Sequence, residues 1–167
     1  MKDKLFLLIG LVVILGSIYL FLQKPANKHY QPNSQALEEI PTPLLPKQGE
    51  RILTINGETF IVEIARTDEE RNLGLSGRET LPEGRGLFFI FNIPGKYGFW
   101  MKDMNFPIDI IWIDESWRVI GVERDINPET FPKIFYPVRA IKYVLELPAG
   151  TAKEKGIDDG SIVYLDS

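Results

Sequence analysis

The sequence predicts a compact, mostly β domain of α+β type over roughly its last 120 residues, built as a small barrel or a sandwich with two short helices. Three observations predict it. Short runs rich in β-branched and aromatic residues recur between turn signals, and Asn56-Gly57 separates two of these runs. Only two short segments carry helix signals. Many short strands at close spacing are typical of both architectures, and the sequence leaves the choice between them open.

Residues 1–4 form a short N-terminal segment, and residues 5–22 form an uncharged, largely apolar run. A helix of that length spans about 27 Å, close to the roughly 30 Å hydrocarbon core of a bilayer. We expect an uncleaved transmembrane signal anchor that attaches the chain to the membrane. A cleaved signal peptide is the main alternative, but no convincing small-x-small site follows the run; a buried soluble helix is the other.

The orientation of this segment is nearly balanced by charge, because Lys2 and Lys4 precede it and Lys24 and Lys28 follow it. The free α-amino group slightly favours a cytoplasmic N-terminus. We therefore expect a single-pass protein of the cell membrane with its C-terminal domain outside the cytoplasm. Residues 23–47 are proline-rich and have no apolar period, which predicts an extended linker.

The domain at residues 48–167 begins with a predicted hairpin, since a type I′ turn at Asn56-Gly57 requires the positive φ that these residues tolerate. Thr67-Asp68-Glu69-Glu70 is a capping-box sequence that begins a short helix, which Gly74 or Gly77 would end. A second short helix is expected near residues 151–155. Strands are predicted at residues 52–55, 58–65, 86–91, 99–102, 108–113, 118–123, 141–147 and 162–165.

Composition excludes several classes of function. The chain has no cysteine, which excludes disulfides, thiol catalysis and thiolate metal sites. Its one histidine, His29, lies in the linker, so a Ser-His-Asp triad and a multi-histidine zinc site in the domain are excluded. The domain carries 14 basic and 20 acidic residues, hence a net charge of −6, which argues against a nucleic-acid partner. We expect no cofactor and no resident metal.

Three blocks of residues, in the same order, resemble the domain of unknown function 192 family, an uncharacterised protein family, over residues 52–166. The most specific feature is Phe99-Trp100-Met101-Lys102 ahead of Pro107-Ile108-Asp109. The blocks read Glu70-Arg71-Asn72-Leu73-Gly74-Leu75-Ser76-Gly77-Arg78, then Phe99 to Asp114, then Tyr143-Val144-Leu145-Glu146-Leu147-Pro148-Ala149-Gly150. The resemblance implies a compact, mostly β domain that is often exported or anchored, and it supplies no reaction.

Asp109 is the most informative candidate, because it lies within a strand of isoleucines and tryptophan. Alternation places it on the face of Ile111 and Ile113. A buried carboxylate there requires a cation or several donors, and Lys102, Arg78 and Arg139 are the candidate cations. It is either a structural ion pair or turn cap, or the anchor of a polar pocket.

Trp100, Lys102, Asp103 and Glu146 complete the candidate ligand-binding set. Trp100 and Lys102 are predicted to share one face of a short strand, where an aromatic plate beside a cation suits a sugar, a carboxylate or a peptide. Glu146 is predicted to share a face with Val144. Together with Asp109 it could form a pair of carboxylates for acid–base chemistry.

The sequence thus predicts a membrane-anchored, extracytoplasmic module that binds a small ligand or a partner in the cell envelope. One alternative is a carboxylate-dependent, hydrolase-like envelope enzyme that uses Asp109 and Glu146. Another is a structural interaction domain without a small ligand, whose exposed apolar patch would lie at residues 131–136. The residues themselves leave open whether any reaction is catalysed.

Overall fold

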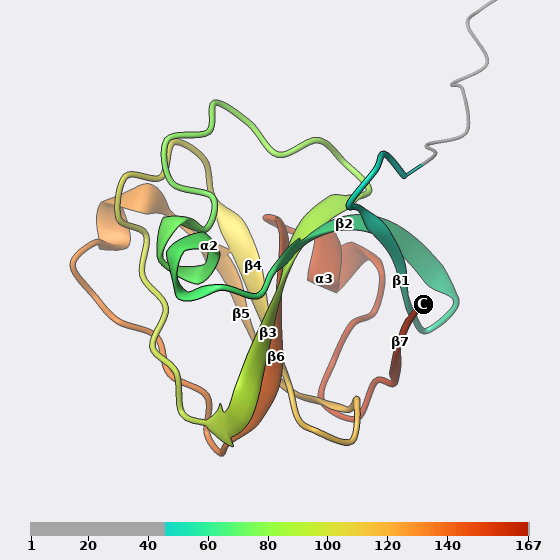
Figure 1. Ribbon diagram of the computed structural model, residues 1–167. Coiled ribbons are helices and arrows are strands. Elements are labelled where there is room, and N and C mark those ends of the chain that lie inside the picture. Colours follow the sequence, from blue (N-terminus) through green and yellow to red (C-terminus); the bar gives the residue numbers. More distant parts are fainter. Residues whose placement is uncertain (1–45, 167) are drawn as a thin grey trace, which may run out of the picture. The chain divides into compact units, whose positions relative to one another are not determined.

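The computed structural model describes residues 46–166 (Figure 1). The predicted membrane anchor at residues 5–22 lies outside this range, as does nearly all of the predicted linker at 23–47. Among the described residues, no helix is both long enough and apolar enough to cross a membrane.

The described residues form one seven-stranded sheet with two short helices. The strand order is β5-β4-β6-β3-β2-β1-β7, and every pair is antiparallel except β2 and β3. The helices are α2 (Asp68–Leu73) and α3 (Thr151–Glu154), with a 3-10 turn η1 at Pro128–Thr130. The strands are β1 (Arg51–Ile55), β2 (Glu58–Ala65), β3 (Arg85–Gly95), β4 (Ile108–Ile113), β5 (Val119–Ile126), β6 (Ile141–Pro148) and β7 (Val163–Leu165).

The local signals of the sequence set the first elements. Asn56 and Gly57 both have positive φ, 53° and 85°, as the predicted β1–β2 hairpin turn requires. The Thr67 hydroxyl accepts a hydrogen bond from the Glu70 amide, while the Glu70 carboxylate accepts one from the Thr67 amide. The α2 helix ends at Gly74, one of the two glycines predicted to end it, and lies in the crossover between the parallel strands β2 and β3.

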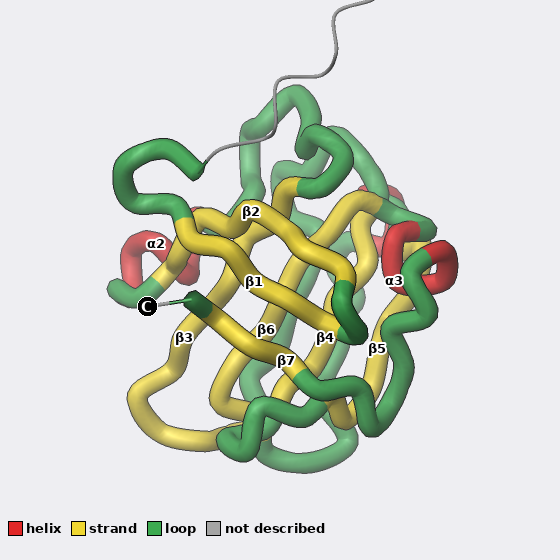
Figure 2. Tube along the Cα trace, turned by 90° about the vertical axis from the view of Figure 1, so that its right-hand side faces the viewer, coloured by secondary structure: helices red, strands yellow, loops and turns green. Residues whose placement is uncertain are grey.

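The sheet is curled into a half-barrel, and the chain segments ahead of its two edge strands meet at one end (Figure 2). Arg118 and Ile162 form an isolated antiparallel bridge there. The Val119 amide donates to the Ser161 carbonyl, 2.9 Å away, and the Val163 amide donates to the Trp117 carbonyl, also 2.9 Å away. This curled arrangement is the barrel-like alternative rather than the sandwich.

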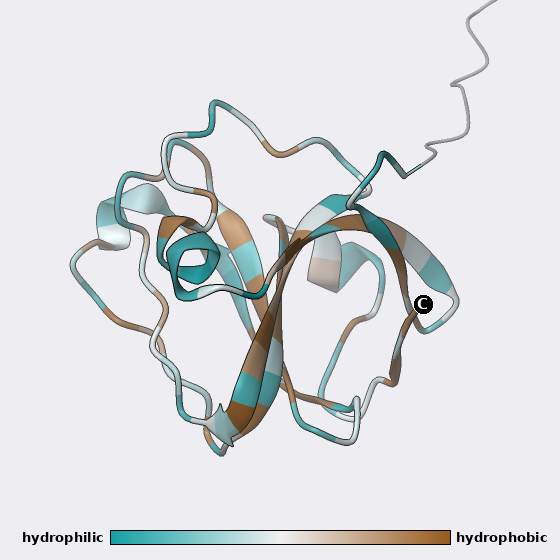
Figure 3. Ribbon diagram, viewed as in Figure 1, coloured by the Kyte–Doolittle hydropathy of each residue, from teal (hydrophilic) through white to brown (hydrophobic). Residues whose placement is uncertain are grey.

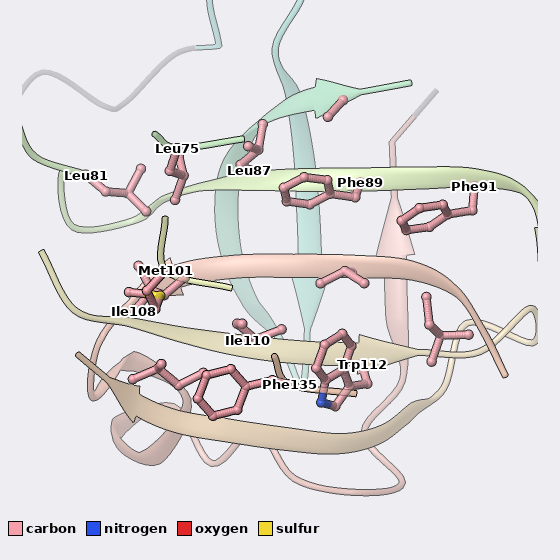
Figure 4. Packing of buried hydrophobic residues seen from close by; sticks show 14 of the residues in the cluster. Leu75, Leu81, Leu87, Phe89, Phe91, Met101, Ile108, Ile110, Trp112 and Phe135 are labelled. Atoms are coloured by element: carbon pink, nitrogen blue, oxygen red, sulfur yellow. The ribbon is translucent and has the colours of Figure 1, made fainter. Parts of the chain in front are cut away.

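The curl divides the hydrophobic core into an inner and an outer part. The inner core is enclosed by residues from all seven strands together with Ala152 of α3. The outer core lies on the other face of β3, β4 and β6, where Leu75, Met101 and Phe135 from irregular segments cover the strands (Figure 4). Each strand in the middle of the sheet therefore buries both faces, and all six residues of β4 are buried.

The structure corrects three of the predicted elements. Residues 99–102 are not a strand, and only Phe99 forms a bridge, with Phe135. β3 continues to Gly95, beyond the predicted end at residue 91, and β5 continues to Ile126, beyond the predicted end at residue 123. The stretch after Phe99 is irregular because it folds back over the outer core, with Met101 buried and Asp103 at a φ of 57°.

Candidate functional site

Glu146 is a carboxylic acid within the apolar outer face of the sheet. It lies in β6 directly opposite Leu87 of β3 and Ile110 of β4, and it shares the face of Val144, as the alternation predicted. Its side chain is only 6% exposed. Oε2 is buried and has no hydrogen-bond partner, whereas buried polar atoms are nearly always paired.

Burial raises the pKa of Glu146 from 4.5 to about 8, because the charged form loses its hydration, and the nearby positive charge of Arg78 only partly offsets this. The group is therefore mostly a neutral acid at pH 7. A neutral carboxyl can donate one hydrogen bond and accept others, so its unpartnered oxygen has hydrogen-bonding capacity that the described residues do not use.

Arg78 lies in the irregular segment after α2 and is committed to another carboxylate. Its Nη1 and Nη2 donate to Oε1 and Oε2 of Glu63 at 2.5 and 3.0 Å, a bidentate ion pair. This pair lowers the pKa of Glu63 and raises that of Arg78. Arg78 thus influences Glu146 through its charge, without a hydrogen bond between the two side chains.

Glu146 borders a pocket of about 380 Å³ between α2, β3 and residues 97–104. Phe89 and Phe91 of β3 contribute one wall, and Phe99 and Trp100 contribute another. Helix α2, whose sequence is mostly hydrophilic (Figure 3), has no buried residue. Because α2 lies at the pocket without packing a buried face on the sheet, it leaves the cavity open to solvent.

The pocket walls are fixed by aromatic stacking. The Phe91 and Tyr97 rings stack with centroids 3.7 Å apart, and the Arg71 guanidinium lies 5.1 Å from the centre of the Phe91 ring. Phe89 and Phe99 meet edge to face at 4.9 Å. A preformed cavity lined by both aromatic and polar side chains is typical of a small-molecule site.

The rim of the pocket exposes large hydrophobic side chains. Leu73 is 63% exposed, Ile93 72% and Trp100 46%, and all three line the pocket. On the far side of Gly98, which also lines it, lie Ile134 and Tyr136 of the predicted apolar patch, both exposed. Exposed apolar side chains therefore form part of the pocket rim, beside the exposed polar side chains of Asp68, Asn72 and Asn92.

Asp109 has a structural role at the opposite face of the sheet. It is fully buried and accepts hydrogen bonds from backbone amides rather than from a cation. Oδ1 accepts from Asp125 at 2.9 Å and from Gly150 at 3.2 Å, and Oδ2 accepts from Ala152 at 2.8 Å. Asp109 thus fixes the turn that leads into α3, which is the turn-cap alternative.

The structure does not bring Asp109 and Glu146 together. The register places Asp109 opposite Leu147 and Ile110 opposite Glu146, so the two carboxylates point to opposite faces of the sheet. The pair required by the predicted carboxylate enzyme is therefore not formed. Lys102, Arg78 and Arg139 do not pair with Asp109; Arg139 lies near Asp114 instead, at 3.7 Å.

Trp100 lines the pocket, but Lys102 and Asp103 do not. The expectation that Trp100 and Lys102 share a strand face fails because no strand forms there. The Lys102 carbonyl accepts from the Ser76 hydroxyl at 2.9 Å, and the Asp103 carbonyl accepts from the Gly77 amide at 2.8 Å. Both residues contribute backbone contacts, and their side chains are exposed.

Sequence reasoning missed the aromatic walls. Phe89, Phe91 and Tyr97 were not candidates, although alternation along 86–91 already places Phe89 and Phe91 on one face. Arg71, at the mouth, was also missed. Among residues 46–166, no cluster of histidine or acidic side chains could hold a metal ion.

Comparisons with known proteins agree with the fold. A crystal structure of a protein of unknown function from Novosphingobium aromaticivorans DSM 12444 is 30% identical, with a TM-score of 0.65 over 68% of this chain and 83% of that one. A proposed transcription regulator from Sinorhizobium meliloti 1021 is 26% identical, with a TM-score of 0.66 over 70% of this chain and 93% of that one. No protein with a curated description matches. The model of the DUF192 family, described as an uncharacterized ACR, matches residues 51–165, and the chain therefore belongs to this family.

Proposed function

We propose that this protein is a ligand-binding module of the cell envelope, anchored in the membrane by residues 5–22 and binding a small molecule in the pocket beside Glu146. The domain lies outside the cytoplasm in this proposal, at the end of the proline-rich linker. The uncharged run of residues and the slight charge bias around it support the anchor and its orientation.

The observation that carries the binding role is the unpartnered Oε2 of Glu146 beside an open cavity. A carboxyl group buried without a partner reduces stability by a few kcal/mol relative to a well-packed apolar residue. A ligand that pairs with this group would remove part of that penalty. The exposed apolar rim supports the same role, since Leu73, Ile93 and Trp100 offer contact area that the folded domain itself leaves unused.

Binding is tested by thermal denaturation of the full-length chain in lipid nanodiscs with a panel of sugars, cell-wall fragments, amino acids and small aromatic compounds. A ligand at 100 times its Kd stabilises by about 2.7 kcal/mol. We expect a hit whose effect is lost in Glu146→Leu and retained in Glu129→Leu, a matched change at an exposed glutamate away from the pocket. A panel without any Glu146-dependent hit would contradict the proposal.

Location is tested separately by cysteine labelling. Because the chain has no cysteine, Glu129→Cys introduces a unique reactive site on the domain surface. Labelling of intact cells by a membrane-impermeant maleimide, and retention of the labelled chain in the membrane fraction, are expected. Labelling only after lysis would show that the domain faces the cytoplasm.

A further inference from the structure

We infer that the Glu146 pocket selects an uncharged ligand in which an apolar group, aromatic or aliphatic, carries an amide. This inference rests on the proposed binding function and specifies its ligand class. It follows from three features of the pocket: its charge balance, the hydrogen-bonding capacity of its buried acid, and the aromatic side chains of its walls.

The charged groups around the pocket compensate one another. At the mouth, Arg71 is paired with Asp68. Its Nη1 also donates to the Arg66 carbonyl and, at 3.0 Å, to the Ile90 carbonyl. Three of the five N–H donors of Arg71 thus have partners, and its charge is compensated by Asp68, so the mouth presents no net charge to an anionic ligand.

The surroundings of Glu146 disfavour a cationic ligand as well. β3 and β4 present Leu87 and Ile110 to it, so neither strand brings a charge. The positive charge that acts on Glu146 comes from Arg78, and Arg78 is itself paired with Glu63, so the two together present no net charge to a ligand. A ligand ammonium would therefore meet no compensating charge while Glu146 keeps its proton. A neutral ligand is the class that enters without leaving an uncompensated charge beside the buried acid.

The buried acid fits an amide. A protonated carboxyl offers one O–H donor and one carbonyl acceptor side by side, and an amide offers a carbonyl acceptor and an N–H donor with the complementary order. Two hydrogen bonds to the same ligand group would therefore satisfy Glu146 once its side chain turns Oε2, which has no exposed surface in the structure, toward the cavity. The apolar part of the ligand would then contact Phe89, Phe99 and Trp100 along the pocket walls.

The test compares three molecules of similar shape: phenylacetamide, phenylacetate and phenethylamine, which are neutral, anionic and cationic. Isothermal titration calorimetry of the full-length chain in nanodiscs, at pH 7 and pH 9, measures each affinity. Phenylacetamide is expected to bind most tightly at pH 7. Because the acid must keep its proton, its affinity should fall about tenfold by pH 9, given the pKa of about 8.

Two variants separate a hydrogen-bonding role from a merely structural one. Glu146→Gln keeps a neutral donor and acceptor but does not titrate, so phenylacetamide affinity should persist and become independent of pH. Glu146→Leu should abolish binding. Glu129→Gln, at an exposed position outside the pocket, should leave both affinity and its pH dependence unchanged.

The outcomes distinguish this inference from the proposed function. Two outcomes would overturn the ligand class and leave the binding function intact. One is preference for phenethylamine, with an affinity that rises about tenfold from pH 7 to pH 9. The other is preference for phenylacetate. No binding of phenylacetamide at pH 7 would overturn the inference even where other compounds bind. Failure of every compound in the wider panel would overturn the binding function as well.

Discussion

Glu146 should make the stability of the domain fall as the pH rises, and Glu146→Gln should remove this effect. In the folded domain the pKa of Glu146 is about 8, whereas its ordinary value is 4.5. Between these two values the unfolded chain has released the proton and the folded chain still holds it. The free energy of unfolding therefore decreases with rising pH across this window and levels off above pH 8.

The magnitude follows from the shift. Each pH unit inside the window changes the free energy of unfolding by about 1.4 kcal/mol, which sums to about 3 to 4 kcal/mol between pH 5 and pH 8. This is a large fraction of the free energy of unfolding of a typical domain, which is about 5–15 kcal/mol. Below pH 4.5 the folded and the unfolded chain both hold the proton, so the pH-dependent loss of stability is absent and the domain is at its most stable with respect to Glu146.

Urea unfolding of residues 46–167 at pH 5, 6, 7 and 8 measures the effect as a difference between the wild type and Glu146→Gln. Any change in packing adds an offset that does not depend on pH, so the slope of the difference isolates the titration of Glu146. Relative to the wild type, the variant should gain about 1.4 kcal/mol per pH unit. Glu129→Gln controls for the loss of one surface carboxylate; parallel curves for wild type and Glu146→Gln would refute the buried neutral acid.

Three further changes should lower the free energy of unfolding, each measured by urea denaturation. Asp109→Ala leaves three amides without their acceptor and should cost about 3 kcal/mol, with Asp109→Asn less severe; equal effects would contradict the amide-cap role. Gly98→Ala places a Cβ 2.6 Å from Cγ2 of Ile134 and should cost about 1–3 kcal/mol, and an unchanged midpoint would show that the Ile134 segment moves freely. Thr67→Ala removes the cap of α2 and should cost about 1 kcal/mol, with Thr67→Ser nearly neutral.

Local chemistry in the sequence predicts most of the elements. The hairpin at Asn56-Gly57, the capping box at Thr67 and the helix end at Gly74 all depend on residues within a few positions of one another, and the structure confirms each of them. Alternation likewise predicts that Val144 and Glu146 share a face of β6. Signals of this kind need no knowledge of the tertiary fold.

Non-local contacts explain what the sequence could not predict. The apolar run at 99–102 reads as a strand, yet it becomes a covering segment because Phe99 bridges only Phe135 and Met101 is buried in the outer core. The parallel pairing of β2 with β3 and the bridge of Arg118 with Ile162 join segments that are far apart in the chain. Periodicity within one segment contains no information about such partners.

The same limit applies to the candidate site. The sequence identified Glu146 and Asp109 as unusual carboxylates but could not give the register that separates them. Once β4 and β6 are aligned, one carboxylate meets backbone amides and the other meets an apolar face. The walls of the pocket come from β3 and from residues 97–104, which only the fold brings next to β6.

The polar residues in the three sequence blocks of the family can be divided by whether their side chains form hydrogen bonds within the domain. Ser76 and Asn105 donate to carbonyls of Lys102 and Arg78 and so fasten the segment after α2 to the segment after Phe99. The Asp109 carboxylate accepts hydrogen bonds from three backbone amides on the other face of the sheet. These contacts account for their presence as architecture.

Glu146 differs from these residues because no contact within the described domain uses its Oε2. A leucine or glutamine at this position would fit the apolar face of β6 without the pH-dependent loss of stability. The fold therefore gives no structural reason for an acid at position 146. A ligand that pairs with this acid does supply one. Comparing the pH profile of stability between the wild type and Glu146→Gln measures the titration of the buried acid. Repeating the comparison with an amide ligand measures the part of the same side chain in binding.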